Sequence, residues 1–168
     1  YDEKCDYDKA LDYLYRSLDL REEIDDKSGM GKSLNNIGVV YFEKGDYDNA
    51  SDYFYRSLKI REEIGSKHGM VISFSNIGGT YFDKGDYEKA EEYYKKAVSG
   101  SKELKLGADF LIWGVVGLNL TYKQLGKAYD KEEIQSLIKE AKKIEFIIYY
   151  SLYQLLEDIS YLEIAHSQ

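Results

Sequence analysis

The sequence predicts an all-α protein in which antiparallel helical hairpins stack into a right-handed superhelical solenoid. Three observations favour this fold class. A ten-residue motif recurs every forty residues, beginning at Tyr1, Tyr41 and Tyr81, and a fixed period of this size is typical of repeat architectures. The chain contains no proline, so no helix needs to be interrupted. Apolar residues recur at spacings of three and four, which is the period of a half-buried helix.

The repeated motif describes the turn of a hairpin. Its copies are YDEKCDYDKA at 1–10, YFEKGDYDNA at 41–50 and YFDKGDYEKA at 81–90, with a weaker fourth copy marked by Tyr122 and Gly126. Gly45 suits the left-handed residue that ends a helix, and Asp46 suits the N-cap of the next one. Cys5 stands where the other copies have glycine. The motif therefore predicts two helices joined by a very tight turn.

The expected positions of the helices follow from these turn and cap residues. Asp6 is the expected N-cap of the first, and polar breaks are expected at 25–29 and 65–69. The second helix is expected from about residue 32, with a start as early as 27 left open. The expected helices are 6–24, 32–44, 47–64, one ending at 84, 87–104, one that Gly126 ends, 131–144 and 146–165, the last with a break near Asp158.

These helices divide the chain into units. Residues 27–66 and 67–106 form complete units, 1–26 the second half of a preceding one, 107–145 a degenerate fourth unit and 146–168 a capping region. The helix that would pair with 6–24 lies before Tyr1, so we expect the chain to be a fragment of a longer signalling protein. We also expect Leu11, Leu14 and Leu18 to lack a partner helix and to pack on another molecule or on further chain.

Charge and composition exclude several function classes. The net charge of −8 and the pI of 4.9 disfavour nucleic acid and anionic membrane surfaces as partners. No apolar run is long enough to span a bilayer. One cysteine forms no internal disulfide, which favours a cytoplasmic setting.

The sequence offers no convergent set of catalytic groups. Cys5 has no base beside it in the sequence, and His68 falls in an expected loop. The two histidines are too far apart for a metal-ligand pair, and neither a dinucleotide nor a phosphate loop motif occurs. We therefore expect neither an enzyme nor a cofactor.

At this point the residues show a family resemblance. The chain resembles the tetratricopeptide repeat through a pattern that recurs in the third copy: Leu34, Ile37, Gly38, Tyr41, Gly45, Asp46, Tyr47, Ala50 and Phe54. The period is forty rather than the usual thirty-four residues. This variant is similar to the repeats of Pins-type adaptors and of bacterial signalling proteins.

The resemblance implies a concave face lined by the first helix of each unit, which binds a peptide or a partner domain. Carried over by register, the expected peptide-binding residues are Lys32, Asn35, Asn36, Val39, Phe42, Ile72, Asn76, Phe82 and Trp113. An amide can hold a peptide backbone, so Asn36 and Asn76 are either a ligand clamp or bonds within the scaffold. Phe42 and Phe82 are either ligand anchors or packing between units, and Trp113 is either the groove floor or core.

The expected partner is a protein or peptide that is neutral or basic, since Glu43 and Asp83 lie near the groove. A clamp for a terminal carboxylate is not expected, because only Lys32 matches such a position. The function predicted is that of an interaction scaffold or regulatory module. The alternative is a structural module that forms homo-oligomers through its ends and leaves the groove empty.

Overall fold

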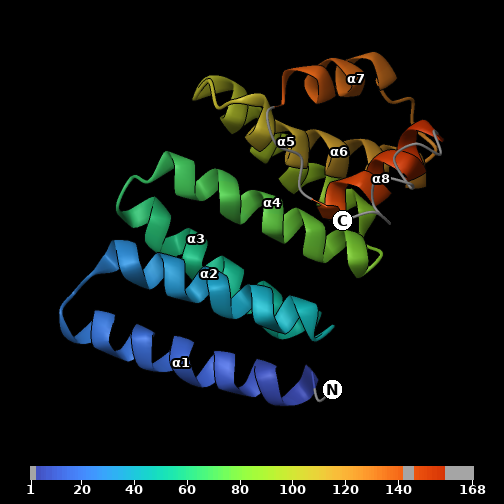
Figure 1. The fold of residues 1–168 in the computed structure, drawn as a ribbon. Coiled ribbons are helices and arrows are strands. Elements are labelled where there is room, and N and C mark those ends of the chain that lie inside the picture. Colours follow the sequence, from blue (N-terminus) through green and yellow to red (C-terminus); the bar gives the residue numbers. More distant parts are fainter. Residues whose placement is uncertain (1–2, 142–145, 158–168) are drawn as a thin grey trace.

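A computed structural model describes residues 3–141 and 146–157, and every regular element in these ranges is a helix (Figure 1). The helices are α1 Glu3–Glu23, α2 Lys27–Glu43, α3 Tyr47–Glu63, α4 Lys67–Asp83, α5 Tyr87–Glu103, α6 Ala108–Gln124, α7 Lys131–Glu140 and α8 Phe146–Leu156.

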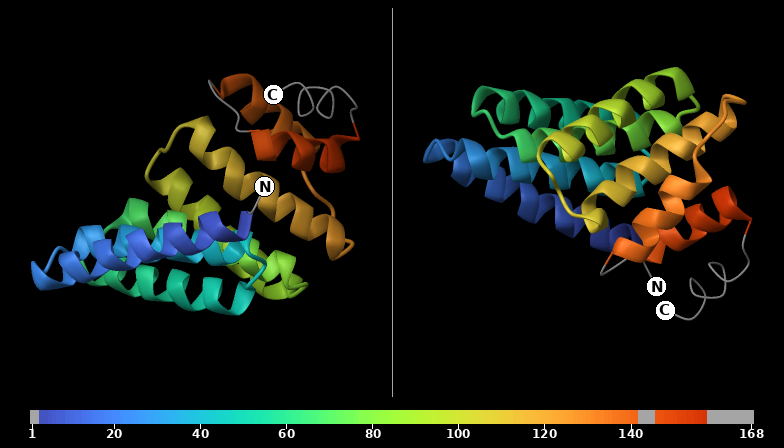
Figure 2. Two further views of the ribbon diagram at one scale, coloured as in Figure 1. Left: turned by 60° about the horizontal axis from the view of Figure 1, so that its bottom comes forward. Right: turned by 90° about the horizontal axis from the view of Figure 1, so that it is seen from above.

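The helices form a stack of hairpins, as predicted. The second hairpin is α2 with α3 and the third is α4 with α5, while α1 packs on α2, α3 on α4 and α5 on α6. The first helices of successive hairpins, α2, α4 and α6, also touch in sequence. Figure 2 shows α1 at one end of the stack and α7 and α8 at the other. Each layer is therefore stabilised mainly by its immediate neighbours.

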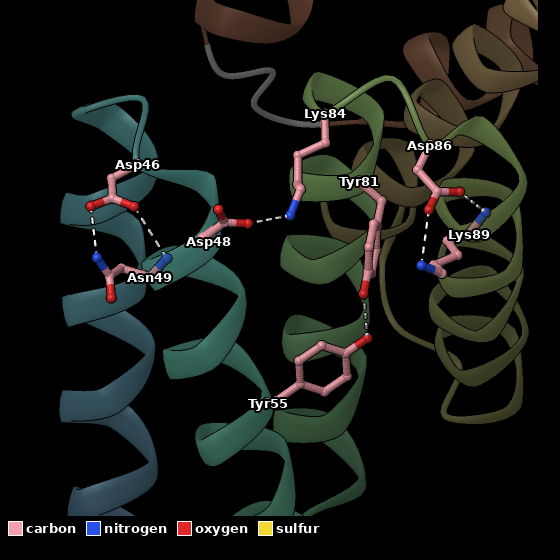
Figure 3. Close-up of polar contacts among 8 residues, drawn as sticks. All are labelled: Asp46, Asp48, Asn49, Tyr55, Tyr81, Lys84, Asp86 and Lys89. Carbon is pink, nitrogen blue, oxygen red and sulfur yellow. Dashed lines mark hydrogen bonds and ion pairs between the residues drawn. The ribbon is translucent and has the colours of Figure 1, made fainter.

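The hairpin turn has the geometry that the motif predicts. Gly45 is left-handed with φ 74°, and its N–H donates to the carbonyl of Phe42 at 2.9 Å. The N–H of Asp46 donates to the carbonyl of Tyr41 at 2.9 Å, which completes the helix end. The Asp46 carboxylate then accepts from the N–H of Asn49 at 3.2 Å, and Figure 3 shows the same cap in the third hairpin.

At the start of the chain the predicted cap is wrong. Helix α1 begins at Glu3, so Asp6 lies inside the helix rather than before it. Cys5 replaces the glycine that ends a helix in the other copies, and a left-handed turn is costly for any residue with a Cβ. The helix therefore continues through this position.

The two polar breaks are shorter than predicted. Helices α2 and α4 begin at Lys27 and Lys67, so Gly29 and Gly69 lie within them. The Asp26 carboxylate caps α2 by accepting from the N–H of Gly29 at 2.9 Å. At Gly69, Arg61 leaves no room for a side chain, because a Cβ would lie 2.8 Å from its Cδ. Arg61 also donates to the Gly69 carbonyl at 2.6 Å.

Small residues allow the two helices of a hairpin to pack closely around one aromatic ring. A Cβ at Gly38 of α2 would lie 2.7 Å from the ring of Phe54 on α3, so only glycine fits there. Phe54 is 1% exposed and also belongs to a cluster with Ile77 of the next hairpin. The glycine thus places a ring that serves both the hairpin and its neighbour.

Two sets of three tyrosines join successive hairpins. In the first tyrosine triad, the Tyr15 hydroxyl of α1 lies 3.0 Å from that of Tyr41 and 2.9 Å from that of Tyr53. The second triad repeats this forty residues later, and its members are Tyr55, Tyr81 and Tyr93. The Tyr55 hydroxyl lies 3.1 Å from that of Tyr81 (Figure 3) and donates to that of Tyr93 at 2.8 Å. Within each triad the two rings of the later hairpin stack, with centroids 5.5 and 5.9 Å apart. Each triad therefore bonds one second helix to the following hairpin.

The fourth hairpin, α6 with α7, departs from the others. Its turn runs from Gly126 to Asp130, whose N–H donates to the side-chain oxygen of the buried Asn119 at 3.1 Å. Helix α7 ends at Glu140 because Ala141 is extended with ψ 130°, so the predicted helix 131–144 is too long. Residues 142–145 lie outside the described part of the chain.

The last described helix, α8, packs against α6. Leu152 and Leu155 of α8 are fully buried in a cluster with Ile112 and Val115 of α6 and Ile134 of α7. The helix ends at Leu156, and Glu157 is left-handed with φ 59°. The predicted continuation to 165, with its break near Asp158, lies outside the described residues.

The prediction that Leu11, Leu14 and Leu18 lack a partner helix is wrong. Leu11 and Leu18 are buried against α2, and Leu14 packs on the same cluster, because a second helix packs on the hairpin that follows it as well as on its own. The exposed large apolar residues at this end of the stack are Tyr13 and Leu20 of α1 and Ile24 directly after it, with 70%, 63% and 74% of their surface exposed.

We predict that Tyr55→Phe lowers the free energy of unfolding by about 1–2 kcal/mol, since it removes two hydroxyl–hydroxyl bonds between hairpins. Urea denaturation followed by circular dichroism measures this. Tyr13→Phe is the matched control, because that hydroxyl is exposed and surface changes have effects within about 0.5 kcal/mol. Equal stabilities of the two variants would contradict the role of the triad.

We also predict that stability falls as the pH rises above about 10, the ordinary pKa of tyrosine. Burial, the hydrogen bonds and the neighbouring tyrosines raise the pKa of Tyr15 and of Tyr55 well above that value. The folded state therefore keeps these protons while the unfolded chain loses them, which favours unfolding. Urea midpoints measured from about pH 8 to 11 should decline less steeply with pH in the Tyr15→Phe/Tyr55→Phe variant than in the native chain. Equal declines in the two proteins would refute the explanation.

Candidate functional site

The candidate site is the face formed by the first helices α2, α4 and α6, and these three helices carry all nine predicted residues. Their exposure differs widely. Lys32, Asn36 and Trp113 are exposed, Asn35 is buried, and the remaining five are half-buried: Val39, Phe42, Ile72, Asn76 and Phe82. The predicted set therefore divides into residues open to a ligand and residues used largely by the scaffold.

One asparagine of the predicted pair is engaged within the protein. The Asn76 amide nitrogen on α4 donates to the side-chain oxygen of Asn35 on α2 at 2.9 Å. Asn35 is 8% exposed, so this bond lies at the junction of two first helices. The structure thus brings together Asn35 and Asn76, whereas the sequence pairs Asn36 with Asn76 through their equal place in the repeat.

Asn36 is in a different situation from its counterpart. It is exposed, and within the described part of the chain its side chain forms no hydrogen bond. Both the donor and the acceptor of its amide are therefore available to another molecule. Of the two asparagines, Asn36 is the better test of ligand binding.

The two phenylalanines pack at the hairpin corners. The Phe42 ring lies 5.5 Å from that of Tyr47, and the Phe82 ring lies 5.4 Å from that of Tyr87. Phe42 also packs on the cluster around Phe54. Both rings therefore take part in packing at the hairpin corners, with part of each ring left at the surface.

Trp113 is the large apolar residue that this face exposes. It lies on α6 at the register of Lys32 on α2 and Ile72 on α4, and 38% of its surface is open to solvent. An indole exposed to this degree is unusual in a core residue and is common at binding sites.

A tyrosine that the sequence analysis missed reaches the same face. The ring of Tyr94 on α5 lies against Gly78 of α4 and Gly117 of α6, and any Cβ at Gly117 would overlap the ring. Its hydroxyl lies 3.3 Å from the position of a Cβ at Gly79. The signal was present in the repeat, since Phe54 and Asn76 at one junction are replaced by Tyr94 and Gly117 at the next.

Asp83 gives this end of the face a negative charge. Burial raises the pKa of its carboxyl, and burial together with the Asp83 charge raises the pKa of Tyr94. Within residues 3–141 and 146–157, Asp83 has no salt-bridge partner. A partly desolvated carboxylate without a cation favours a positively charged neighbour.

No catalytic or metal centre emerges from the described residues. They contain no group of three or more histidine, cysteine, aspartate or glutamate side chains placed to hold a metal ion. His68 lies against the ring of Phe110, with centroids 4.9 Å apart. A search of the same residues for helices long and apolar enough to cross a membrane also finds none.

Comparisons with known proteins agree with this geometry. The tetratricopeptide repeat family model matches residues 1–63 and 29–103. No curated protein matches the chain.

Solved structures show the same fold at low sequence identity. BtubC (BKLC) from P. vanneervenii superposes with a TM-score of 0.67 at 18% identity, over 84% of this chain and 57% of that one. The putative kinesin light chain of Podosopora anserina, with nearly identical TPR-like repeats, gives 0.64 at 16% identity over 99% and 89% of the two chains. A single-substitution variant of that kinesin light chain gives 0.66 at 16% identity over 99% and 88%.

The family model covers more than half of the chain, and its matches coincide with the stacked hairpins described above. Repeats of this kind generally mediate protein–protein interactions and are typically not enzymes. The chain belongs to the tetratricopeptide repeat family.

Proposed function

We propose that this protein binds a peptide or a partner domain on the face formed by α2, α4 and α6, as an interaction module of a cytoplasmic signalling protein. The observation that carries the proposal is the exposure of Trp113 in register with Lys32 and Ile72. Asn36, exposed and without a hydrogen bond in the described chain, supplies a polar contact on the same face.

The charge of this face supports a neutral or basic ligand. Glu43 and Asp83 lie near the ends of α2 and α4, and Asp83 has no salt bridge among the described residues. Lys32 is the exposed cation among the proposed contacts. Complementary charge mainly increases the rate and the specificity of association.

A peptide library selected on the folded chain tests this function. For peptides that bind, we predict that Trp113→Ala weakens binding at least tenfold, since buried indoles dominate interfaces. Asn36→Ala should weaken it roughly fivefold, about the contribution of one hydrogen bond. Isothermal titration measures both effects. Lys59→Ala is the control, because Lys59 is an exposed residue of α3.

Asn36→Ala should not change the urea midpoint, because its side chain is exposed. Trp113→Ala should lower the midpoint, because only 38% of the Trp113 surface is exposed and the change removes buried apolar area. Asn76→Ala is a poorer probe, since it also breaks the bond to Asn35. The proposal would be contradicted if the selected peptides bound all these variants as tightly as they bind the native chain.

A second function is favoured by one observation, the exposure of Tyr13 and Leu20 on α1. Their counterparts Tyr53 and Ile60 are half-buried against the first helix of their own hairpin. We propose that a second copy of the chain covers this α1 face, which would make the protein a self-associating module.

If so, we predict that sedimentation gives a dimer for the native chain and a monomer for Leu20→Glu, since a charge at this position is costly to bury. Asp19→Asn, on another side of α1, is the control and should leave the dimer intact. A native chain that stays monomeric at every concentration would exclude this function and leave the peptide-binding proposal unaffected.

A further inference from the structure

The third hairpin carries a hollow between α4 and α5 that is separate from the predicted peptide-binding residues. Its volume is about 460 Å³, and its apolar lining comes from Met70, Val71, Phe74 and Leu104. Gly100 contributes bare backbone to the α5 side. None of the nine residues of the candidate site lines this α4–α5 hollow.

The hollow arises from an exchange of side-chain bulk between the two helices of a hairpin. In the second hairpin, Gly31 of α2 lies under Ile60 of α3, whose Cγ2 would be 3.7 Å from a Cβ on the glycine. Forty residues later the sizes are reversed. Val71 of α4 lies against Gly100 of α5, and a Cβ on that glycine would be 2.6 Å from the valine Cγ2.

The exchange makes the surface of the third hairpin different from that of the second. Ile60 is half-buried and packs on the apolar cluster of Leu34 and Ile37, so it covers the outside of its hairpin. At the same place the third hairpin has Gly100, which has no side chain, and the apolar floor beside it stays open. The space is therefore suited to one aliphatic side chain supplied by another molecule.

The rim of the hollow is cationic in an acidic protein. Its ionisable residues are Lys67, Lys95 and Lys96 against the single Glu103, whereas the whole chain has a net charge of −8. Lys96 lies over the rings of Phe74 and Tyr93, at 5.9 and 4.7 Å from their centroids.

Each of these lysines also pairs with a carboxylate, and the pairs of Lys67 and Lys96 are exposed. Lys95 contacts Glu91 at 2.7 Å, Lys96 contacts Glu92 at 2.7 Å, and Lys67 contacts Glu103 at 2.9 Å. Exposed pairs contribute little, so the ammonium groups of Lys67 and Lys96 can exchange their partners readily. The partner of Lys95 differs, because Glu91 is 13% exposed and also pairs with Lys127.

We propose that the α4–α5 hollow docks a short acidic segment of a partner protein. One leucine or isoleucine of the segment is seated beside Gly100 on Met70 and Phe74, and flanking carboxylates pair with Lys95 and Lys96. This surface prefers the opposite charge from the face of α2, α4 and α6. The proposal therefore stands whether or not that face binds a peptide.

The second hairpin provides a matched variant for the test. Val71→Gly with Gly100→Ile gives the third hairpin the residues of the second at both places, so the numbers of glycines and branched residues stay the same. The probe is a short peptide with one central leucine flanked by glutamates, added to isotope-labelled protein and followed by NMR. We expect saturable shifts at Met70 and Leu104 in the native chain and at least tenfold weaker binding in the variant.

Peptide and protein controls separate the two parts of the interaction. Replacing the peptide leucine by alanine, or Lys95 and Lys96 by glutamine, should each weaken binding at least fivefold, while Asn36→Ala should not change it. If the exchanged variant fails to fold, the Lys95→Gln/Lys96→Gln variant carries the test alone. The proposal is overturned if a lysine-flanked peptide binds as tightly, if the shifts fall elsewhere, or if the shifts arise from self-association of the chain.

Discussion

Contact between one second helix and the hairpin that follows it is the constraint on which this structure depends. A single hairpin has two apolar faces and covers neither alone. The tyrosine triads show how the contact is made, since Tyr15 and Tyr55 each reach across to two hydroxyls of the next hairpin. The rings bury apolar area while the hydroxyls bond to one another, which suits a thin protein whose core lies close to water.

Because these contacts repeat, local sequence signals predicted most of the fold. The turn at Gly45 and Asp46 was predictable because each residue serves a local need, a left-handed backbone and a helix cap. Gly29 and Gly69 were misread as breaks for the opposite reason. At Gly69 the missing Cβ makes room for Arg61, which is eight residues away and on another helix. A glycine required by packing looks the same in a sequence as one required by a turn.

The helices that carry the nine predicted residues were predictable from the sequence, but the contacts of those residues were not. Register alone placed the nine residues on the first helices, because equal positions in a repeat lie on equal sides. Register did not predict the hydrogen bond between Asn76 and Asn35, because that bond depends on how adjacent first helices are offset. It predicted instead that Asn76 aligns with Asn36. Tyr94 was missed because it belongs to a second helix and reaches the face only where Gly78 and Gly117 leave room.

The two exchanges between the second and third hairpins differ in what they leave behind. Replacing Phe54 and Asn76 at one junction by Tyr94 and Gly117 at the next keeps the space filled, because the larger ring occupies the place of the lost side chain.

Moving bulk from Ile60 to Val71 instead leaves part of the surface uncovered beside Gly100. In a solenoid such a change stays local, since each hairpin contacts mainly its neighbours. One hairpin can therefore acquire a surface of its own charge and shape while the tyrosine contacts that hold the stack remain the same.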